Sequence, residues 1–193
     1  MLSRLRSMKK LEDLILTYKD FPKKGIAFRD LLGIMQDPEV FRELIIKMSS
    51  SKVVRNSEAI ISIEARGFIF GSAIALQASK PMIVARKPGK LPGELIQEDY
   101  ILEYGKNSLS IQKESLKKFR SYAIVDDLLA TGGTVECVSK LIQRNGKQVS
   151  GLLTVVELLE LNGRSKLEFP VETLLSIWDL WKKIFYFEVE FTK

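Results

Sequence analysis

Two adjacent acids, Asp126 and Asp127, stand between an apolar stretch and a turn of small residues. Residues 123–125 are apolar in the manner of a buried strand, and residues 130–134 read Ala-Thr-Gly-Gly-Thr. Apolar side chains then recur at helical spacing, at Val135, Val138, Leu141 and Ile142. Glycines let backbone N–H groups approach an anion closely, and a helix N-terminus adds its positive dipole end. The segment therefore predicts a phosphate cradle.

The two carboxylates add a second chemistry to this cradle. At the carboxyl end of a strand, Asp126 and Asp127 are placed for ribose hydroxyls or for a hydrated divalent cation. A solvated turn with two capping acids would explain the Asp-Asp pair alone. It does not explain the whole strand, acid pair, glycine turn and helix.

Composition excludes several kinds of active site. The 193-residue chain has no histidine and one cysteine, Cys137. Ser-His-Asp and Cys-His catalysis and His- or Cys-ligated zinc are therefore excluded, and proton transfer must use Asp, Glu, Lys, Tyr or the substrate. A single cysteine forms no intrachain disulfide, which fits a reducing compartment, and we expect a cytoplasmic protein.

Charge and hydropathy argue against two classes of partner. The net charge is +6, but the basic residues are spread along the chain and form no recognised nucleic-acid motif, so we expect no nucleic-acid partner. No apolar run reaches the roughly 18–20 residues that span a bilayer, so we expect no membrane partner. Residues 1–10 are basic without the apolar core of a secretory signal, which leaves a disordered start or a transit peptide.

Strands and helices alternate along the middle of the chain. Asp37-Pro38 is an N-cap with proline at the first helical position, and it opens a helix with an apolar face through Met48. The patterns predict strands at 59–63, 82–85, 123–125 and 149–156, and further helices at 67–76 and 134–144. Such alternation predicts an α/β fold, a parallel twisted sheet flanked by helices.

Other segments lie outside this alternation. Leu11, Leu14, Ile15 and Tyr18 predict an amphipathic helix that ends near Phe21-Pro22. Residues 100–103 and 109–112 predict a hairpin that closes at 105–107. Alternating apolar side chains at 185–191 predict an extra C-terminal strand, either an edge strand or docking tail, or a second interaction surface.

Five ordered segments resemble the type I phosphoribosyltransferases, and the form of the glycine turn resembles the branch that uses adenine. The similarity covers roughly residues 11–170. The segments are Phe21-Pro22 with 25–30, then 63–68, 86–93, 102–105 and 121–134. The resemblance implies a single domain over 1–193, with a small N-terminal hood at 11–34 and a C-terminal extension at 176–193.

The resemblance also implies a reaction. A purine nitrogen of adenine would displace pyrophosphate from phosphoribosyl pyrophosphate (PRPP) to give AMP. The PRPP-binding residues would be Asp126, Asp127, Leu128, Leu129, Ala130, Thr131, Gly132, Gly133 and Thr134. Mg²⁺ is the expected cofactor, held mainly by PRPP and water, with Asp126 and Asp127 as candidate protein ligands.

Basic residues at two loops would hold the leaving pyrophosphate. The candidates are Arg66, Arg86, Lys87 and Lys90. In the family, the residue that matches Arg86 serves the neighbouring subunit's site, which implies a homodimer. A solvated basic loop is the alternative for residues 86–90.

Purine recognition and proton transfer would involve three further segments. Glu103 matches the family's glutamate near purine N7, where desolvation favours a protonated general acid. An exposed hairpin glutamate is the alternative. Residues 92–106 would form a lid over the substrate. The resemblance places Ala27, Phe28, Arg29 and Leu158 around the base.

Two other functions stay open at this point. A 6-oxopurine phosphoribosyltransferase, for hypoxanthine, guanine or xanthine, would share the PRPP cradle, but such enzymes usually place base-binding elements towards the C-terminus. A non-catalytic PRPP-binding regulator would keep the cradle and lose catalysis. Glu103 and Arg66 argue for a working enzyme.

Overall fold

The computed structural model describes residues 11–102 and 105–178, and the side chains of 100–106 lie outside that description. The described residues form two compact units. One ends at Leu44 and includes Trp178, and the other runs from Ile45 to Ile177. The expectation of a single domain over 1–193 stays a prediction.

The first unit contains a small antiparallel pair of strands. Strand β1 (Leu16–Lys19) pairs with β2 (Ala27–Asp30), with Tyr18 opposite Phe28. The predicted amphipathic helix is therefore wrong beyond its first turn, since only residues 11–13 are helical. Pairing with β2 gives the backbone of β1 its hydrogen-bond partners. A helix this short is only marginally stable by itself, so the strand pairing prevails.

Helix α2 (Pro38–Ser49) begins as its sequence predicts, after the 3-10 helix η1 (Leu32–Gln36). The Asp37 carboxylate accepts hydrogen bonds from the backbone N–H groups of Glu39 and Val40, both at 3.1 Å. These bonds satisfy donors that the first helical turn otherwise leaves unpaired. Leu44, Ile45 and Met48 on its apolar face are buried.

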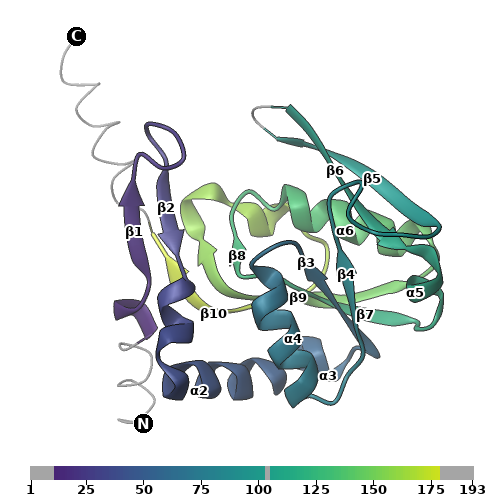
Figure 1. Cartoon of the computed structure of the whole chain (residues 1–193), viewed down its shortest axis with the longest axis horizontal. Coiled ribbons are helices and arrows are strands. Elements are labelled where there is room, and N and C mark those ends of the chain that lie inside the picture. Colours follow the sequence, from purple (N-terminus) through teal and green to yellow (C-terminus); the bar gives the residue numbers. More distant parts are fainter. Residues whose placement is uncertain (1–10, 103–104, 179–193) are drawn as a thin grey trace. The chain divides into compact units, whose positions relative to one another are not determined.

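The second unit is built on a parallel sheet with the strand order β10-β9-β7-β3-β4, as Figure 1 shows. Four of its strands match predicted ones: β3 (Ala59–Ile63), β4 (Met82–Ala85), β7 (Ser121–Val125) and β9 (Gln148–Leu158). The two-residue strand β8 (Leu128–Leu129) and β10 (Val171–Ile177) both pair with β9. The predicted parallel α/β sheet is confirmed.

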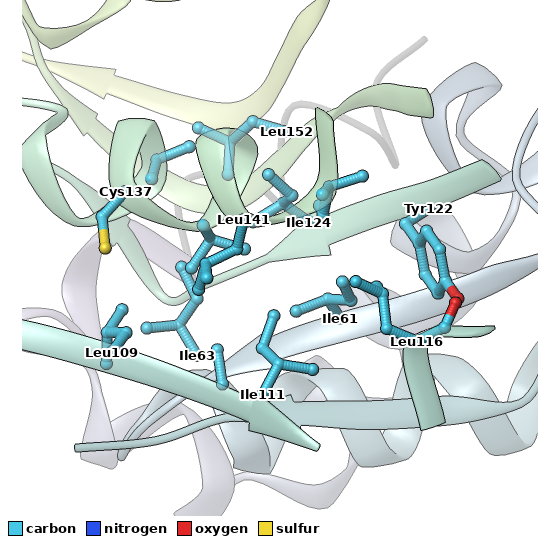
Figure 2. Close-up of a cluster of buried hydrophobic side chains, with 14 of the residues drawn as sticks. Ile61, Ile63, Leu109, Ile111, Leu116, Tyr122, Ile124, Cys137, Leu141 and Leu152 are labelled. Carbon is cyan, nitrogen blue, oxygen red and sulfur yellow. The ribbon is translucent and has the colours of Figure 1, made fainter. Parts of the chain in front are cut away.

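Helices pack against both faces of this sheet. Alternate side chains of β3 point to opposite faces. Ile61 and Ile63 belong to the core cluster that includes Cys137 and Leu141 of α6 (Gly133–Arg144), as Figure 2 shows. Ser62 faces α4 (Gly67–Gln77), where the helix approaches most closely at Gly71. The shorter helices are α3 (Lys52–Arg55), α5 (Lys113–Lys117), η2 (Leu159–Leu161) and η3 (Gly163–Lys166).

A long hairpin follows β4 in the chain and packs against α6. Strands β5 (Leu95–Leu102) and β6 (Gly105–Gln112) pair throughout, with Leu102 opposite Gly105. The predicted closure at 105–107 is wrong, because those residues already pair with β5. Glu98 ties the hairpin to α6, since its carboxylate bonds Arg144 and its carbonyl lies 3.3 Å from the Cys137 thiol. The predicted strand at 185–191 lies outside the described residues.

No helix in the described part of the chain is long and apolar enough to cross a membrane. Cys137 lies in the core, where burial raises the pKa of its thiol to about 11. A thiol with this pKa stays protonated at neutral pH, so the native protein holds it in an unreactive form.

The contact between α4 and β3 depends on a glycine. A β-carbon on Gly71 would lie 2.3 Å from Ser62 Oγ and 2.6 Å from Ser62 Cβ. We expect Gly71→Ala to destabilise the protein by about 1–3 kcal/mol, because the helix must move away from the sheet. Urea unfolding measures the change. Ser72→Ala, an exposed position on the same helix, should change stability by less than about 0.5 kcal/mol, and equal effects would contradict the packing argument.

Candidate functional site

The carboxyl ends of three neighbouring parallel strands meet at one edge of the sheet. Strands β9, β7 and β3 lie side by side, and the chain leaves them at Leu158, Val125 and Ile63. Open α/β sheets bind ligands at this edge because the loops that follow the strands converge there. The loop that carries Arg66 and the predicted cradle at 126–134 therefore lie at the same edge of the sheet.

The acid pair lies directly after β7. Asp127 is only 5% exposed, whereas Asp126 is half-buried. The Asp126 carboxylate accepts a 2.9 Å hydrogen bond from the Asp127 backbone N–H, and the Asp127 carboxylate lies 2.7 Å from Arg66 Nε. The Asp127 carbonyl accepts bonds from two N–H groups of β9 at 3.1 and 3.2 Å. The backbone that carries both acids is thus fixed to the sheet.

Burial sets the proton affinity of both acids. It raises the pKa of Asp126 well above its usual range, and the neighbouring Asp127 charge raises it further. Burial also raises the pKa of Asp127, although the Arg66 guanidinium opposes that rise. Two carboxylates this close are held ionised most readily when a further cation joins them.

The phosphate cradle has the geometry that its sequence predicts. Gly132 adopts a left-handed conformation, with φ of 79°, and caps the N-terminus of α6. Its carbonyl accepts the Glu136 N–H at 2.9 Å, the first bond of the helix. In the described part of the chain, the N–H groups of Thr131–Thr134 make no bond to a backbone carbonyl. These donors lie at the positive end of a helix, where they could bind an anion.

A close approach that the sequence pattern did not reveal involves Gly67, the first residue of α4. A β-carbon there would lie 2.8 Å from Asp126 Oδ1 and 3.1 Å from the Val125 carbonyl. Glycine is therefore needed for α4 to begin beside the acid pair. The sequence offered one signal, the position of Gly67 directly after Arg66 in the 63–68 segment. Only the contact between α4 and the end of β7 explains why a glycine is needed there.

The basic candidates divide between two loops. Arg66 precedes α4 and pairs with Asp127. Arg86 follows β4, where Nη2 donates to Glu64 at 3.1 Å and the guanidinium lies 5.7 Å from the Phe68 ring. The Arg86 hydrogen bond, first among several causes, lowers the pKa of Glu64. Glu64, which the sequence reasoning did not single out, thus holds Arg86 against its own subunit's 64–67 loop.

Two basic candidates of the 86–90 loop are exposed. Lys87 donates its backbone N–H to the Glu64 carboxylate at 2.9 Å, and the Lys90 carbonyl accepts from Arg86 Nη1 at 3.3 Å. Both lysine side chains face solvent. The loop is therefore anchored by Glu64 and Arg86, and its two ammonium groups are available to an anion.

The base-binding candidates lie in different units. Ala27, Phe28 and Arg29 form part of β2 in the first unit, where the Phe28 ring meets the Phe21 ring edge-on at 5.2 Å and Arg29 bonds Thr17. Leu158 ends β9 in the second unit and is 8% exposed. Their meeting around one base stays a prediction. Glu103 lies outside the described residues.

The sequence matches the family described as the phosphoribosyl transferase domain over residues 35–189. This chain belongs to that family. It is 71% identical to an adenine phosphoribosyltransferase of Prochlorococcus marinus (strain MIT 9515), over 86% of this chain and 98% of that protein. It is 44% identical to one from Clostridium perfringens (strain SM101 / Type A), over 88% of this chain and 99% of the relative.

Solved structures of adenine phosphoribosyltransferases have the same fold as this phosphoribosyl transferase. The Rhodothermus marinus structure has a TM-score of 0.81 and 32% identity, with 90% of this chain and 99% of that one covered. The Saccharomyces cerevisiae structure, in complex with an imino-altritol bisphosphate and adenine, has a TM-score of 0.80 and 34% identity, with 89% and 99% covered.

The raised pKa of Asp126 predicts a stability change with a definite sign. The folded state binds its proton at higher pH than the unfolded chain, so stability falls as pH rises from about 4 through the raised pKa. Asp126→Asn removes this loss and keeps an oxygen acceptor. We expect the variant to be more stable than wild type at pH 7, because it carries no charge at this buried position.

The difference between variant and wild type should shrink towards pH 4. Urea unfolding at several pH values from 4 to 7 measures it. Asp13→Asn, at an exposed carboxylate of the first unit, is the control and should follow wild type throughout. A difference for Asp126→Asn that is independent of pH would contradict the burial argument.

Proposed function

We propose that this chain is an adenine phosphoribosyltransferase: it joins adenine to the ribose of PRPP and releases pyrophosphate, a step of purine salvage. One observation carries the proposal. An acid pair and a row of free N–H groups stand together at the carboxyl edge of a parallel sheet. The relatives that match nearly their whole length are adenine phosphoribosyltransferases, which supports adenine as the acceptor.

The cradle binds the 5′-phosphate of PRPP. Backbone N–H groups of Thr131–Thr134 donate to phosphate oxygens, and the two threonine hydroxyls add further bonds. Asp126 and Asp127 hold the ribose 2′- and 3′-hydroxyls. Because the backbone of both acids is tied to β9, the ribose is held in one orientation, which lowers the entropic part of the barrier.

The donor set at the acid pair fits Mg²⁺. Both acids offer oxygen ligands, and the raised pKa of each supports the proposal, because a bound cation would stabilise the charged pair. Among the described residues, no group of three or more acidic, His or Cys side chains could hold a metal. Phosphate oxygens and water would therefore complete most of the octahedron. When bound, Mg²⁺ supplies charge neutralisation at the pyrophosphate.

The basic residues act on the leaving group. As the bond at ribose carbon 1 breaks, negative charge grows on pyrophosphate and a positive, oxocarbenium-like charge grows on the sugar. Arg66, Lys87 and Lys90 stabilise the departing anion, and Arg86 adds to this set in the neighbouring subunit's site of a homodimer. The Glu64–Arg86 bond must then open or be shared when the dimer binds substrate.

Base recognition and proton transfer complete the reaction. Phe28 supplies an apolar surface for the purine, with Ala27 and Arg29 at its edge. Glu103 acts as the general acid at N7: it protonates N7 while N9 gives up its proton to water, which frees the N9 lone pair to bond ribose carbon 1. The N7 proton returns to Glu103 as that bond forms. The β5–β6 hairpin carries Glu103 and closes as a lid that excludes water. The reaction is cytoplasmic.

The acceptor base is decided by a direct assay. The protein is incubated with PRPP, Mg²⁺ and, separately, adenine, hypoxanthine, guanine or xanthine, and nucleotide formation is followed by chromatography. We expect AMP from adenine and no product from the other bases. Product only from a 6-oxopurine would overturn the choice of base. Binding of PRPP without turnover of any base would make the protein a regulator.

The role of Glu103 is tested by Glu103→Gln. A glutamine keeps the shape and cannot donate the proton, so we expect kcat to fall by about 2–4 orders of magnitude with little change in the KM for adenine. Steady-state kinetics with saturating PRPP measure both constants. Glu94→Gln, an exposed position at the base of the same hairpin, is the matched control. An unchanged kcat, with chemistry rate-limiting, would reduce Glu103 to a positional role.

A further inference from the structure

A turn of the second unit lies against the phosphate cradle, and its first residue, Gly163, is buried. Gly163 opens η3, and a β-carbon on it would lie 2.1 Å from the Ala130 carbonyl and 2.9 Å from Gly132 N. In the other direction, a β-carbon on Gly132 would lie 2.7 Å from the Gly163 carbonyl. The two backbones therefore touch with no room for a side chain on either. The Gly163 backbone thus packs directly against the backbone of the cradle.

This turn is held in place by an arginine beside it. Arg164 Nε lies 2.9 and 3.2 Å from the two carboxylate oxygens of Glu157, and its Nη2 also bonds that carboxylate. Its Nη1 donates to the Val171 carbonyl at 2.8 Å, at the start of β10. One planar guanidinium thus joins two strands and fixes the turn between them, which the point charge of a lysine does not reproduce.

The carboxylate that Arg164 binds also connects to the cradle. Glu157 is 3% exposed, and it lies opposite Leu129, the residue just before Ala130, in the β8–β9 register. The cradle is therefore held from both sides. Strand β9 fixes its entry through Leu129, and η3 fixes its middle through Gly163. Both supports converge on the Glu157–Arg164 pair.

We propose that Gly163 and Arg164 are positioning residues for the 5′-phosphate. They touch no substrate, but they set the path of the loop whose N–H groups bind it. Anion binding by a row of N–H groups is sensitive to sub-ångström displacement, because each bond weakens with distance and angle. This role rests on the proposed function and goes beyond it, since it assigns PRPP affinity to a turn outside the binding motif.

Ribose 5-phosphate and pyrophosphate, bound separately to the full-length protein, distinguish this role from general stability. Calorimetry measures both dissociation constants. Gly163→Ala should weaken the binding of ribose 5-phosphate by about tenfold or more, which is the effect of one misaligned charge-assisted hydrogen bond. The constant for pyrophosphate, whose partners follow β3 and β4, should change by less than about twofold. In kinetics, the KM for PRPP rises while the KM for adenine does not.

Gly151→Ala is the matched control. A β-carbon there would lie 2.6 Å from the Pro170 carbonyl, a comparable backbone collision on β9 that does not touch the cradle. It should lower stability and leave the ribose 5-phosphate constant unchanged. If Gly163→Ala does not fold, Arg164→Lys carries the test. It keeps the charge beside Glu157 and loses the bond to Val171, and it should weaken ribose 5-phosphate by about threefold or more.

The outcomes separate this role from the proposed function. Wild-type ribose 5-phosphate affinity in folded Gly163→Ala or Arg164→Lys would overturn the positioning role and leave the enzyme assignment standing. Equal weakening by Gly151→Ala would also overturn it, by reducing the effect to stability. If the wild-type protein neither binds ribose 5-phosphate in calorimetry nor makes AMP from adenine and PRPP, the proposed function is overturned, and this role with it.

Discussion

The carboxylate of Asp127 is almost fully buried at the carboxyl edge of the sheet, and the surrounding elements are arranged to accommodate its charge. Moving an ion from water into protein costs several kcal/mol unless nearby groups compensate. Here Arg66 compensates it through a 2.7 Å contact, and that contact places the start of α4 beside the end of β7. Two acids with raised pKa values remain close together at this site. A ligand that brings hydroxyl groups and a cation would lower the free energy of their charged forms.

Glycines make this arrangement sterically possible. Gly67 lets α4 begin against the acid pair, and Gly132 turns the chain through a conformation that other residues rarely adopt. Gly163 then closes the cradle from behind. At each of these points, backbone meets backbone or a short carboxylate, so no flexible side chain can move aside. The functional edge of the fold is thus rigid where ligand must be held.

Carboxylates link the hairpin and the 86–90 loop to neighbouring elements. Glu98 links the hairpin to α6, and Glu64 links the 86–90 loop to the loop after β3. The hairpin is also held by apolar packing, since Leu109 and Ile111 of β6 are buried in the core cluster.

Much of this fold was readable from the sequence, because its strands are short apolar runs and its helices have clear periodicity and caps. β3, β7, α2 and α6 all appear where patterns predict them, within a few residues. The patterns failed at Leu16–Lys19, because four apolar residues spread over 11–18 suggested a helix, whereas pairing with β2 makes this segment a strand. They also misplaced the hairpin turn, because Gly105, Lys106 and Asn107 have the composition of a turn but pair with β5.

For the site, the sequence by itself determined the phosphate cradle, since a strand, two acids, a glycine turn and a helix are local and need no distant partner. It also determined what chemistry is excluded, because a chain without histidine cannot use it. Only the tertiary structure decided that Arg66 meets Asp127, that Glu64 holds Arg86 and that Gly163 supports Gly132. These contacts join residues far apart in the chain, and their register depends on how parallel strands align, which no local pattern specifies.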